Sequence, residues 1–263
     1  MTQKMKNTIF FTENLAIGYS SKKETISIAK NININLEKGK LIALIGANGI
    51  GKSTLLRTIA AIQKPLSGTI YLNDKNISTY NSQQLAQNIS VVFTEKLPPS
   101  NLSVFELIAL GRQPYTNWLG KLCADDLLKI EEALKVTQIE HLRHKKHFEL
   151  SDGQLQQVLI ARALAQDAPL IILDEPTTHL DLVNKVSLLK LLLKLTRSTN
   201  KCILFSSHDI DLAIQLSDQM IVFANDTIVQ DEPCKLIENG IFESIFKNEC
   251  IVFDKLKGTF KIT

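Results

Sequence analysis

The 263-residue sequence has only four cysteines, and no two of them form a Cys-x-x-Cys pair. They are scattered along the chain, at Cys123, Cys202, Cys234 and Cys250. Cysteines without such spacing are typical of reduced thiols in a cytosolic protein, and not of a disulfide framework. We therefore expect the fold to be held by its core and not by covalent cross-links.

Long apolar runs are also absent. No stretch approaches the roughly 20 apolar residues that span a bilayer, and residues 186–195, an apolar candidate, are interrupted by lysines. The polar N-terminal residues 1–7 are not followed by an apolar signal region. These features predict a cytoplasmic location.

The chain lacks a strong excess of one charge, since 30 Lys and Arg oppose 27 Asp and Glu, a formal net charge of +3. This excess is too small to indicate a nucleic-acid partner. The hydrophobic content of 44% suffices for one domain with a subdomain.

A glycine-rich segment carries the most explicit chemistry. It follows an apolar run at residues 41–45, typical of a strand buried on both faces, and precedes a helical pattern at 52–59. Its glycines let backbone amides face phosphate groups, and the helix start adds partial positive charge. Lys52 is expected to reach the β- and γ-phosphates and Ser53 to ligate Mg²⁺. The predicted phosphate-binding loop is Gly46-Ala47-Asn48-Gly49-Ile50-Gly51-Lys52-Ser53-Thr54.

A pair of carboxylates follows a second apolar run, at residues 170–173. Neighbouring carboxylates at the end of a buried strand are costly unless a cation or a reaction uses them. Asp174 is expected to hold Mg²⁺, and Glu175 to orient or deprotonate an attacking water. A surface Asp-Glu pair is the simpler alternative.

Together with further motifs, these segments resemble the ATP-binding cassette (ABC) ATPases. The family's signature is matched by Leu150-Ser151-Asp152-Gly153-Gln154, with Asp152 where glycine is commoner. Its D-loop is matched by Thr178-His179-Leu180-Asp181, and its switch histidine by His208. The motifs occur in the family's order, and the resemblance covers essentially the whole chain.

The resemblance implies ATP as the nucleotide, Mg²⁺ as its metal and an ATPase activity. It implies a head-to-tail homodimer in which the signature residues, Ser151, Asp152, Gly153 and Gln154, contact the γ-phosphate bound by the partner. It also implies that His208 touches the γ-phosphate and holds Glu175, and that Tyr19 stacks on adenine. Local alternatives remain open: Ser151 and Asp181 also suit helix caps, and Tyr19 a core position.

One position departs from the family's pattern. The family carries glutamine after the strand that precedes the helical subdomain, and here residues 89–93 are followed by Thr94-Glu95. Neither side chain reproduces a neutral amide, and a carboxylate would repel the γ-phosphate. A metal contact from Thr94 or Glu95 is therefore the weakest part of the predicted site, and slower hydrolysis is a possible consequence.

The expected fold is α/β: a P-loop NTPase core with an antiparallel β subdomain and an inserted helical subdomain, all within one domain, 1–263. The core takes about 1–95 and 165–263. The helical subdomain takes about 96–164, with helices expected at 103–110, 125–137 and 153–166. The tail from about residue 225 shows no recognisable chemistry.

A histidine-rich segment, His141, His144 and His147, lies just before the signature. Adjacent lysines and arginine oppose metal binding by neutral imidazoles. We expect a solvated basic connector without a metal.

Residues 102–115 and 175–181 resemble the ATP-binding subunits of importers for ferric siderophores, haem and cobalamin. In those importers the region near residues 102–120 forms a groove for a membrane permease subunit, and Tyr115 and Trp118 would suit it, although either could equally be core. A substrate-binding protein would then be an indirect partner, and the chain peripheral at the inner face of the membrane. The alternatives are a soluble ABC ATPase, such as an iron–sulfur assembly factor, or a nucleotide-binding module with low turnover.

Overall fold

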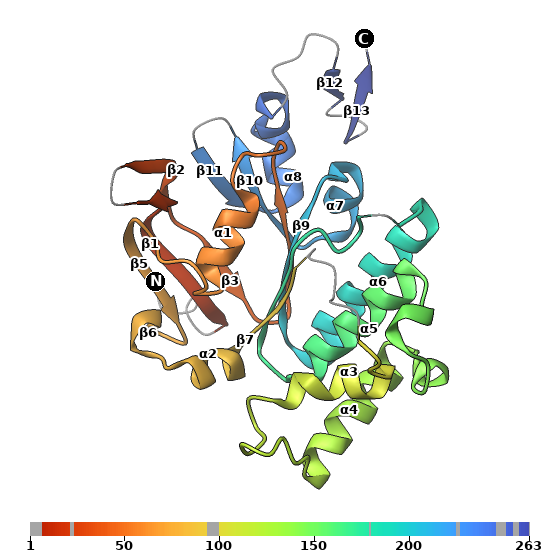
Figure 1. Ribbon diagram of the computed structural model, residues 1–263. Coiled ribbons are helices and arrows are strands. Elements are labelled where there is room, and N and C mark those ends of the chain that lie inside the picture. Colours follow the sequence, from red (N-terminus) through yellow and green to blue (C-terminus); the bar gives the residue numbers. More distant parts are fainter. Residues whose placement is uncertain are drawn as a thin grey trace.

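The structure is a computed structural model that describes residues 7–21, 24–93, 100–178, 180–224, 227–245, 251–254 and 258–262. A central sheet lies between a curved antiparallel sheet on one side and a group of helices on the other (Figure 1). Among the described residues, no helix combines the length and the apolar character of a membrane span.

The central sheet has six strands in the order β11-β10-β4-β9-β8-β7. All neighbouring pairs are parallel except β10 with β11. The strands are β4 (Leu41–Ile45), β7 (Ile89–Val92), β8 (Leu170–Leu173), β9 (Cys202–Ser207), β10 (Gln219–Ala224) and β11 (Thr227–Asp231). Every residue of β4, β8 and β9 is buried, as their continuous apolar sequences predict.

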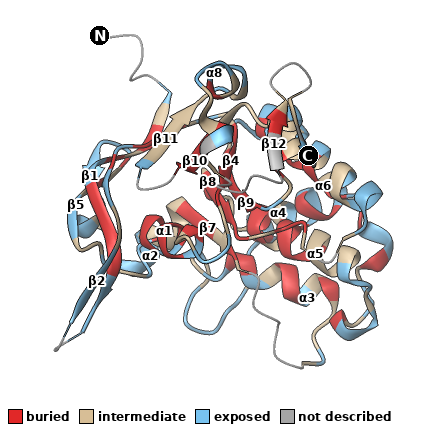
Figure 2. Ribbon diagram, turned by 90° about the horizontal axis from the view of Figure 1, so that it is seen from above, coloured by how far each residue is buried: buried red, intermediate tan, exposed pale blue. Residues whose placement is uncertain are grey.

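Alternate residues of β4 build two cores, one on each face of this sheet. Ile42 and Leu44 pack with α1 (Lys52–Ile59) and the antiparallel sheet. Leu41 and Ala43 face the opposite core. That second core includes apolar residues of α6 (Leu182–Thr199) and α7 (Ile210–Leu216). Buried residues accordingly follow the central strands and the inner faces of the helices (Figure 2).

The antiparallel sheet has five strands, in the order β2-β1-β5-β6 with β3 paired to β1. It contains β1 (Thr8–Ser20), β2 (Thr25–Ile32), β3 (Asn35–Glu37), β5 (Ser67–Leu72) and β6 (Lys75–Asn76), followed by a 3-10 turn, η1 (Ile77–Thr79), and by α2 (Ser82–Asn88). The expected antiparallel β part of the fold is therefore present.

The helical part comprises α3 (Val104–Ala109), α4 (Ala124–Val136) and α5 (Asp152–Ala165), with 3-10 turns η2 (Leu110–Arg112), η3 (Glu140–Leu142) and η4 (His147–Glu149). Buried Arg112 ties these helices together. Its Nε donates to Asp126 Oδ1 (2.8 Å) at the start of α4, and Nη1 donates to the carbonyl of Ala165 (2.8 Å) at the end of α5. Its guanidinium also lies 4.0 Å from the ring centre of Tyr115.

The histidine-rich segment differs from expectation at one residue. His147 is buried and its ring packs edge-on against Phe148, so the prediction of a fully solvated connector is wrong there. The His147 amide donates to the carbonyl of Leu102, which draws this turn onto the entry to α3. Tertiary packing therefore overrides the local basic composition.

The C-terminal segment adds α8 (Pro233–Glu238), η5 (Ile241–Ser244) and a hairpin of β12 (Ile251–Asp254) and β13 (Thr259–Ile262). The rings of Phe242 and Phe253 stack with centres 5.1 Å apart, and both side chains belong to the larger core. This contact anchors the hairpin to the rest of the domain.

Candidate active site

Three parallel strands of the central sheet end side by side, and each is followed by polar residues. In the register, Ile45 at the end of β4 pairs with Ser207 in β9, and Leu173 at the end of β8 pairs with Phe205. The carboxyl ends of parallel strands form the usual ligand-binding edge of an open α/β sheet. This edge brings together the glycine-rich loop after β4, the carboxylates after β8 and the histidine after β9.

The glycine-rich loop has the conformation that its composition predicts. Gly49 and Gly51 have φ angles of +74° and +114°, a region that side chains strongly disfavour. A Cβ on Gly51 would lie 2.4 Å from Cγ2 of Ile28, so the loop also approaches the antiparallel sheet closely. The turn then leads directly into α1, whose N-terminus contributes partial positive charge.

Lys52 is buried at the start of α1, and its ammonium lies within the loop. The Nζ atom donates to the carbonyls of Gly46 (2.8 Å) and Ala47 (3.1 Å). Burial lowers the pKa of Lys52 below its ordinary value, although the carboxylates of Glu175 and Asp174 act in the opposite sense. The lysine is thus positioned as a cation that faces both the loop and the acidic pair.

Ser206, a polar residue at the end of the apolar strand β9, joins the two carboxylate residues. Its hydroxyl donates to Asp174 Oδ1 (2.7 Å) and accepts from the backbone amide of Glu175 (2.8 Å). Ser206 has no exposed surface. No role was predicted for this serine from the sequence; a polar residue at the end of a buried apolar strand was the available signal.

Glu175 is held in an unusual backbone conformation with both carboxylate oxygens engaged. Its φ angle is +49°, which is costly for a residue with a side chain and is frequent at functional sites. Oε1 lies 2.5 Å from Nε2 of His208, and Oε2 accepts from the Thr178 hydroxyl at 3.2 Å. The carboxylate therefore has a fixed orientation at the mouth of the loop.

These residues line one pocket of about 480 Å³. Tyr19 lies at its edge with a half-exposed ring, and its hydroxyl is 3.0 Å from the Thr54 hydroxyl. The exposed ring is available for stacking, which disfavours the alternative of a core tyrosine. The sequence-predicted residues that line this pocket are Tyr19, Asn48, Gly49, Gly51, Lys52, Ser53, Thr54, Glu175 and His208.

The signature and D-loop residues line a separate pocket of about 450 Å³. Ser151 caps α5: its hydroxyl accepts from the Gln154 amide (3.3 Å), and Gln154 Oε1 accepts from the Ser151 amide (3.2 Å). Asp181 caps α6 by accepting from the Asn184 amide at 2.9 Å. Both helix-cap alternatives are therefore correct as local structure, and a cap leaves the exposed helix start open to a ligand. The predicted residues here are Ser151, Asp152, Gly153, Gln154 and Asp181.

Oxygen donors suited to Mg²⁺ are present beside the loop. Asp174 offers a carboxylate and Ser53 a hydroxyl, the ligand types that Mg²⁺ takes together with phosphate oxygens and water. Within the described part of the chain, no group of three or more His, Cys, Asp or Glu side chains could hold a metal alone. The donor set thus fits a metal bound along with a phosphate. Thr94 and Glu95 lie outside the described residues, and their predicted contact is untested.

The comparisons with known proteins agree with this geometry. The model of the ABC transporter family matches residues 29–178. The chain belongs to the ABC transporter family. The iron(3+)-hydroxamate import ATP-binding protein of Bacillus subtilis is 37% identical over 261 residues, covering 94% of this chain and 96% of that protein.

Solved structures of ABC proteins share the fold. An ABC transporter described as of the metal-chelate type, in an inward-facing conformation, has a TM-score of 0.79 and 29% identity over 97% of this chain and 96% of that one. A dimeric bacterial ABC transporter cassette has a TM-score of 0.73 and 28% identity over 86% of this chain and 99% of that one. The predicted ABC ATPase fold and the assignment as an ATP-binding ABC ATPase are confirmed.

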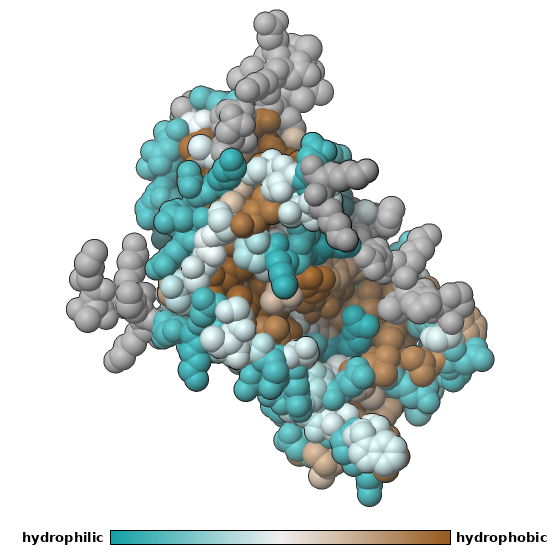
Figure 3. All heavy atoms as spheres, turned by 60° about the vertical axis from the view of Figure 1, so that its left-hand side comes forward, coloured by the Kyte–Doolittle hydropathy of each residue, from teal (hydrophilic) through white to brown (hydrophobic). Residues whose placement is uncertain are grey.

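This ABC ATPase exposes apolar side chains on the connection between α3 and α4. Trp118 is 91% exposed and Leu119 67%, while Tyr115 is 39% exposed and lies against Arg112. Of the two alternatives for Trp118, a core position is therefore wrong. On the face shown in Figure 3, hydrophilic residues cover most of the periphery and hydrophobic residues gather toward the middle and right.

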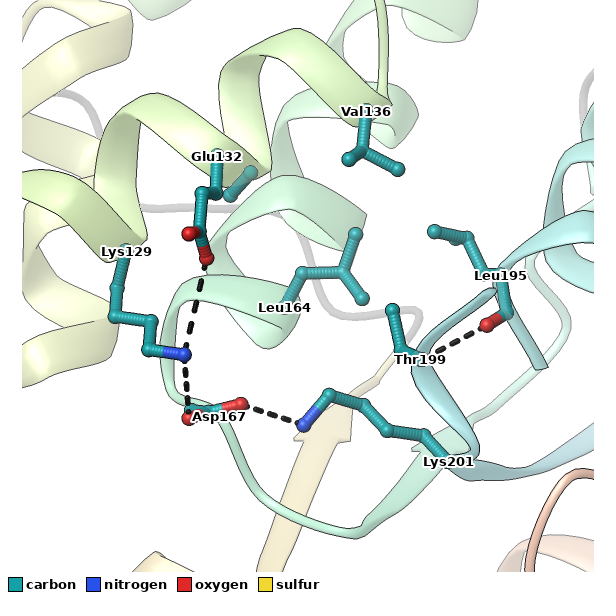
Figure 4. A pocket seen from close by; sticks show the side chains of 9 residues that line it. Lys129, Glu132, Val136, Leu164, Asp167, Leu195, Thr199 and Lys201 are labelled. Carbon is teal, nitrogen blue, oxygen red and sulfur yellow. Dashed lines mark hydrogen bonds and ion pairs between the residues drawn. The ribbon is translucent and has the colours of Figure 1, made fainter. Parts of the chain in front are cut away.

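A further pocket, of about 280 Å³, lies away from the nucleotide site, between α4, the end of α5 and the C-terminal end of α6. Asp167 lies at its edge and binds two lysines, Lys201 at 2.7 Å and Lys129 at 3.1 Å (Figure 4). These ion pairs connect α4 to Lys201, the residue directly before β9. The pocket contains none of the predicted site residues, and we interpret its charged edge as a structural link.

Proposed function

We propose that this chain is the ATP-hydrolysing subunit of an importer for an iron complex, such as a ferric siderophore or haem, or for cobalamin. The observation that carries the proposal is the convergence of Lys52, Asp174, Glu175 and His208 at one sheet edge. A relative named for iron(3+)-hydroxamate import and a structural neighbour of the metal-chelate type support the solute class.

The site's own residues account for hydrolysis. Lys52 binds the β- and γ-phosphate oxygens together with the loop amides, and Tyr19 stacks on the adenine. When bound, Mg²⁺ would offset phosphate charge, and Ser53 and Asp174 are the residues that would hold it. Glu175 orients the attacking water and takes its proton, while His208 holds the carboxylate through the 2.5 Å contact.

A homodimer would complete the site. The signature pocket and the phosphate-loop pocket share no lining residue, so one chain carries two separate half-sites. A head-to-tail dimer would bring each phosphate loop against the partner's Ser151–Gln154 segment, whose exposed helix start suits a phosphate. The dimeric cassette among the structural neighbours supports this arrangement.

The permease would bind near residues 102–120, where Tyr115 and Trp118 are exposed. Arg112 couples this surface to the signature helix α5 through the carbonyl of Ala165. The chain would then lie in the cytoplasm, peripheral to the membrane, with the substrate-binding protein contacting only the permease. In the domain division predicted from the sequence, the helical subdomain at about 96–164 would bind the permease, and the core would bind the nucleotide.

The ATPase rate of purified protein tests the catalytic part. Glu175→Gln should lower kcat about a hundredfold or more because the amide takes no proton from water. Glu140→Gln, which changes an exposed acid at the start of η3, is the matched control and should keep the wild-type rate. Turnover that does not depend on Glu175 would contradict the mechanism.

Reconstitution with its permease in vesicles tests the transport part. ATP should drive uptake of a ⁵⁵Fe-siderophore, ⁵⁵Fe-haem or labelled cobalamin with the wild-type chain and not with Glu175→Gln. Glu175-dependent ATPase activity without uptake of any of the three would contradict the solute class and leave the ATPase mechanism standing.

A further inference from the structure

The two half-sites differ in charge. The phosphate-loop pocket contains Lys52 and His208 beside Glu175, and the buried Lys52 ammonium donates to the carbonyl of Gly46. Among the described residues that line the signature pocket, two are carboxylates, Asp152 and Asp181, and none is a lysine, arginine or histidine. A nucleotide triphosphate that enters between them meets the ammonium of Lys52 on one side and the carboxylates of Asp152 and Asp181 on the other.

The two carboxylates of the signature pocket are used differently. Asp181 is occupied as a helix cap, since Oδ1 accepts from the Asn184 amide (2.9 Å) and Oδ2 from the Asn184 side chain (2.8 Å). Asp152 is the first residue of the 14-residue helix α5 and is exposed. Among the described residues, its carboxylate makes no hydrogen bond or ion pair. Its charge is therefore available to whatever approaches the start of α5.

We propose that Asp152 is a positioning residue that opposes closure of the two chains around ATP and so raises the ATP concentration at which the dimer forms. The inference rests on the proposed homodimer, in which the start of α5 meets the partner's γ-phosphate. A helix N-terminus attracts anions through its free amides and its dipole. The Asp152 carboxylate partly neutralises the positive end of the dipole of its own helix, which weakens the attraction for a phosphate. It also repels the phosphate directly.

The same charge stabilises the separate chain. A carboxylate in the first turn interacts favourably with the helix dipole, so Asp152 favours α5 before closure and disfavours the closed state. The neighbouring cap does not depend on it, because Ser151 and Gln154 bond to each other. Asp152 thus acts on the equilibrium between open and closed states without forming part of the helix cap.

Screening by salt distinguishes this role from a structural one. Repulsion between Asp152 and a phosphate weakens as ionic strength rises, with a Debye length of about 10 Å at 0.1 M and about 3 Å at 1 M. The decrease in the ATP midpoint of dimer formation on removal of the Asp152 charge should therefore be large at low salt and small at high salt. A change in packing would persist at both.

The test measures dimer formation by light scattering in the hydrolysis-slowed Glu175→Gln background, titrated with MgATP. The mass should rise from the 29.4 kDa of one chain toward twice that value. Asp152→Asn and Asp152→Gly should lower the ATP midpoint about tenfold at low salt, with the gap closing at 1 M NaCl. Asp152→Glu retains the charge and should match the parent.

A matched control and a binding measurement complete the design. Asp74→Asn makes the same change in net charge in an exposed turn between β5 and β6 and should leave the midpoint unchanged. The affinity of the single chain for a fluorescent ATP analogue should be the same in all variants. Equal midpoints for Asp152→Asn and the parent would overturn the role of Asp152 alone. Absence of an ATP-dependent dimer in every variant would overturn the homodimer as well.

Discussion

Ser206→Ala tests how the acidic pair is held. Ser206 is fully buried and bonds to Asp174 Oδ1 (2.7 Å) and to the amide of Glu175 (2.8 Å). Removal of the hydroxyl leaves the Glu175 amide without that acceptor and takes one donor from Asp174. A buried group that loses its partner costs about 1–3 kcal/mol, so we expect a loss of about 2–4 kcal/mol in the free energy of unfolding.

The effect on catalysis follows from the backbone of Glu175. The hydrogen bond from the Glu175 amide to the Ser206 hydroxyl helps to fix the Glu175 backbone, whose φ angle is +49°. A small shift of the Glu175 carboxylate would move the attacking water. We expect kcat for ATP hydrolysis to fall about 10–100-fold, because catalysis is sensitive to displacements of about 1 Å. The ATP affinity of the loop should change little, since Ser206 does not line the nucleotide pocket.

Urea unfolding and steady-state ATPase assays measure both effects, with Ser207→Ala as the control. Ser207 is also buried; among the described residues its hydroxyl accepts only from the amide of Asp209 (3.0 Å), and it makes no hydrogen bond to Asp174 or Glu175. Ser207→Ala should lose about 1 kcal/mol of stability and keep its kcat within about threefold. A Ser206→Ala protein with wild-type stability and kcat would refute the reasoning.

Two further changes test the loop and the charged link. Gly51→Ala should destabilise the fold by about 2 kcal/mol or more and abolish ATP-analogue binding, because its Cβ would meet Ile28 at φ +114°; unchanged binding and stability would contradict the predicted strain. For Asp167, burial raises the pKa, but the hydrogen bonds and charges of Lys201 and Lys129 outweigh burial, so the pKa lies below its ordinary value. Its contribution is therefore present above the unfolded pKa of about 3.9 and lost as pH falls through the folded value. Asp167→Asn should cost about 1 kcal/mol at pH 7 and progressively less below about pH 4, as measured by urea unfolding; a cost independent of pH would contradict the ion-pair account (Figure 4).

The parts of the site that could be predicted from the sequence are those whose residues lie within one short, continuous segment. The loop around Lys52 and the carboxylates after β8 each combine an apolar strand with the residues that directly follow it, so local order sufficed. The role of Ser206 depends on the pairing of β8 with β9, which no single segment contains. The hydrogen bond from Arg112 to the carbonyl of Ala165 similarly joins residues 53 positions apart.

Burial was the property that local composition predicted least well. His147 lies in a basic segment, which predicts an exposed side chain, yet the packing of η4 against the residues before α3 buries it. Trp118 is an aromatic that could have been core and is almost fully exposed. In both cases the outcome is set by the arrangement of elements around the residue and not by its neighbours in the chain.

A mixing experiment tests the composite ATP site most directly. One chain carries Lys52→Ala, with a defective phosphate loop, and the other carries Ser151→Glu, with a carboxylate at the signature helix start. Each homodimer then lacks an intact site, whereas the mixed dimer restores one site from the intact loop of one chain and the intact signature of the other.

The account predicts that each variant alone is inactive and that an equimolar mixture recovers about a quarter of the wild-type ATPase rate, since half of the dimers are mixed and each has one intact site of two. A mixture that stays inactive, while both variants still form dimers with the wild-type chain, would contradict a site shared between two chains.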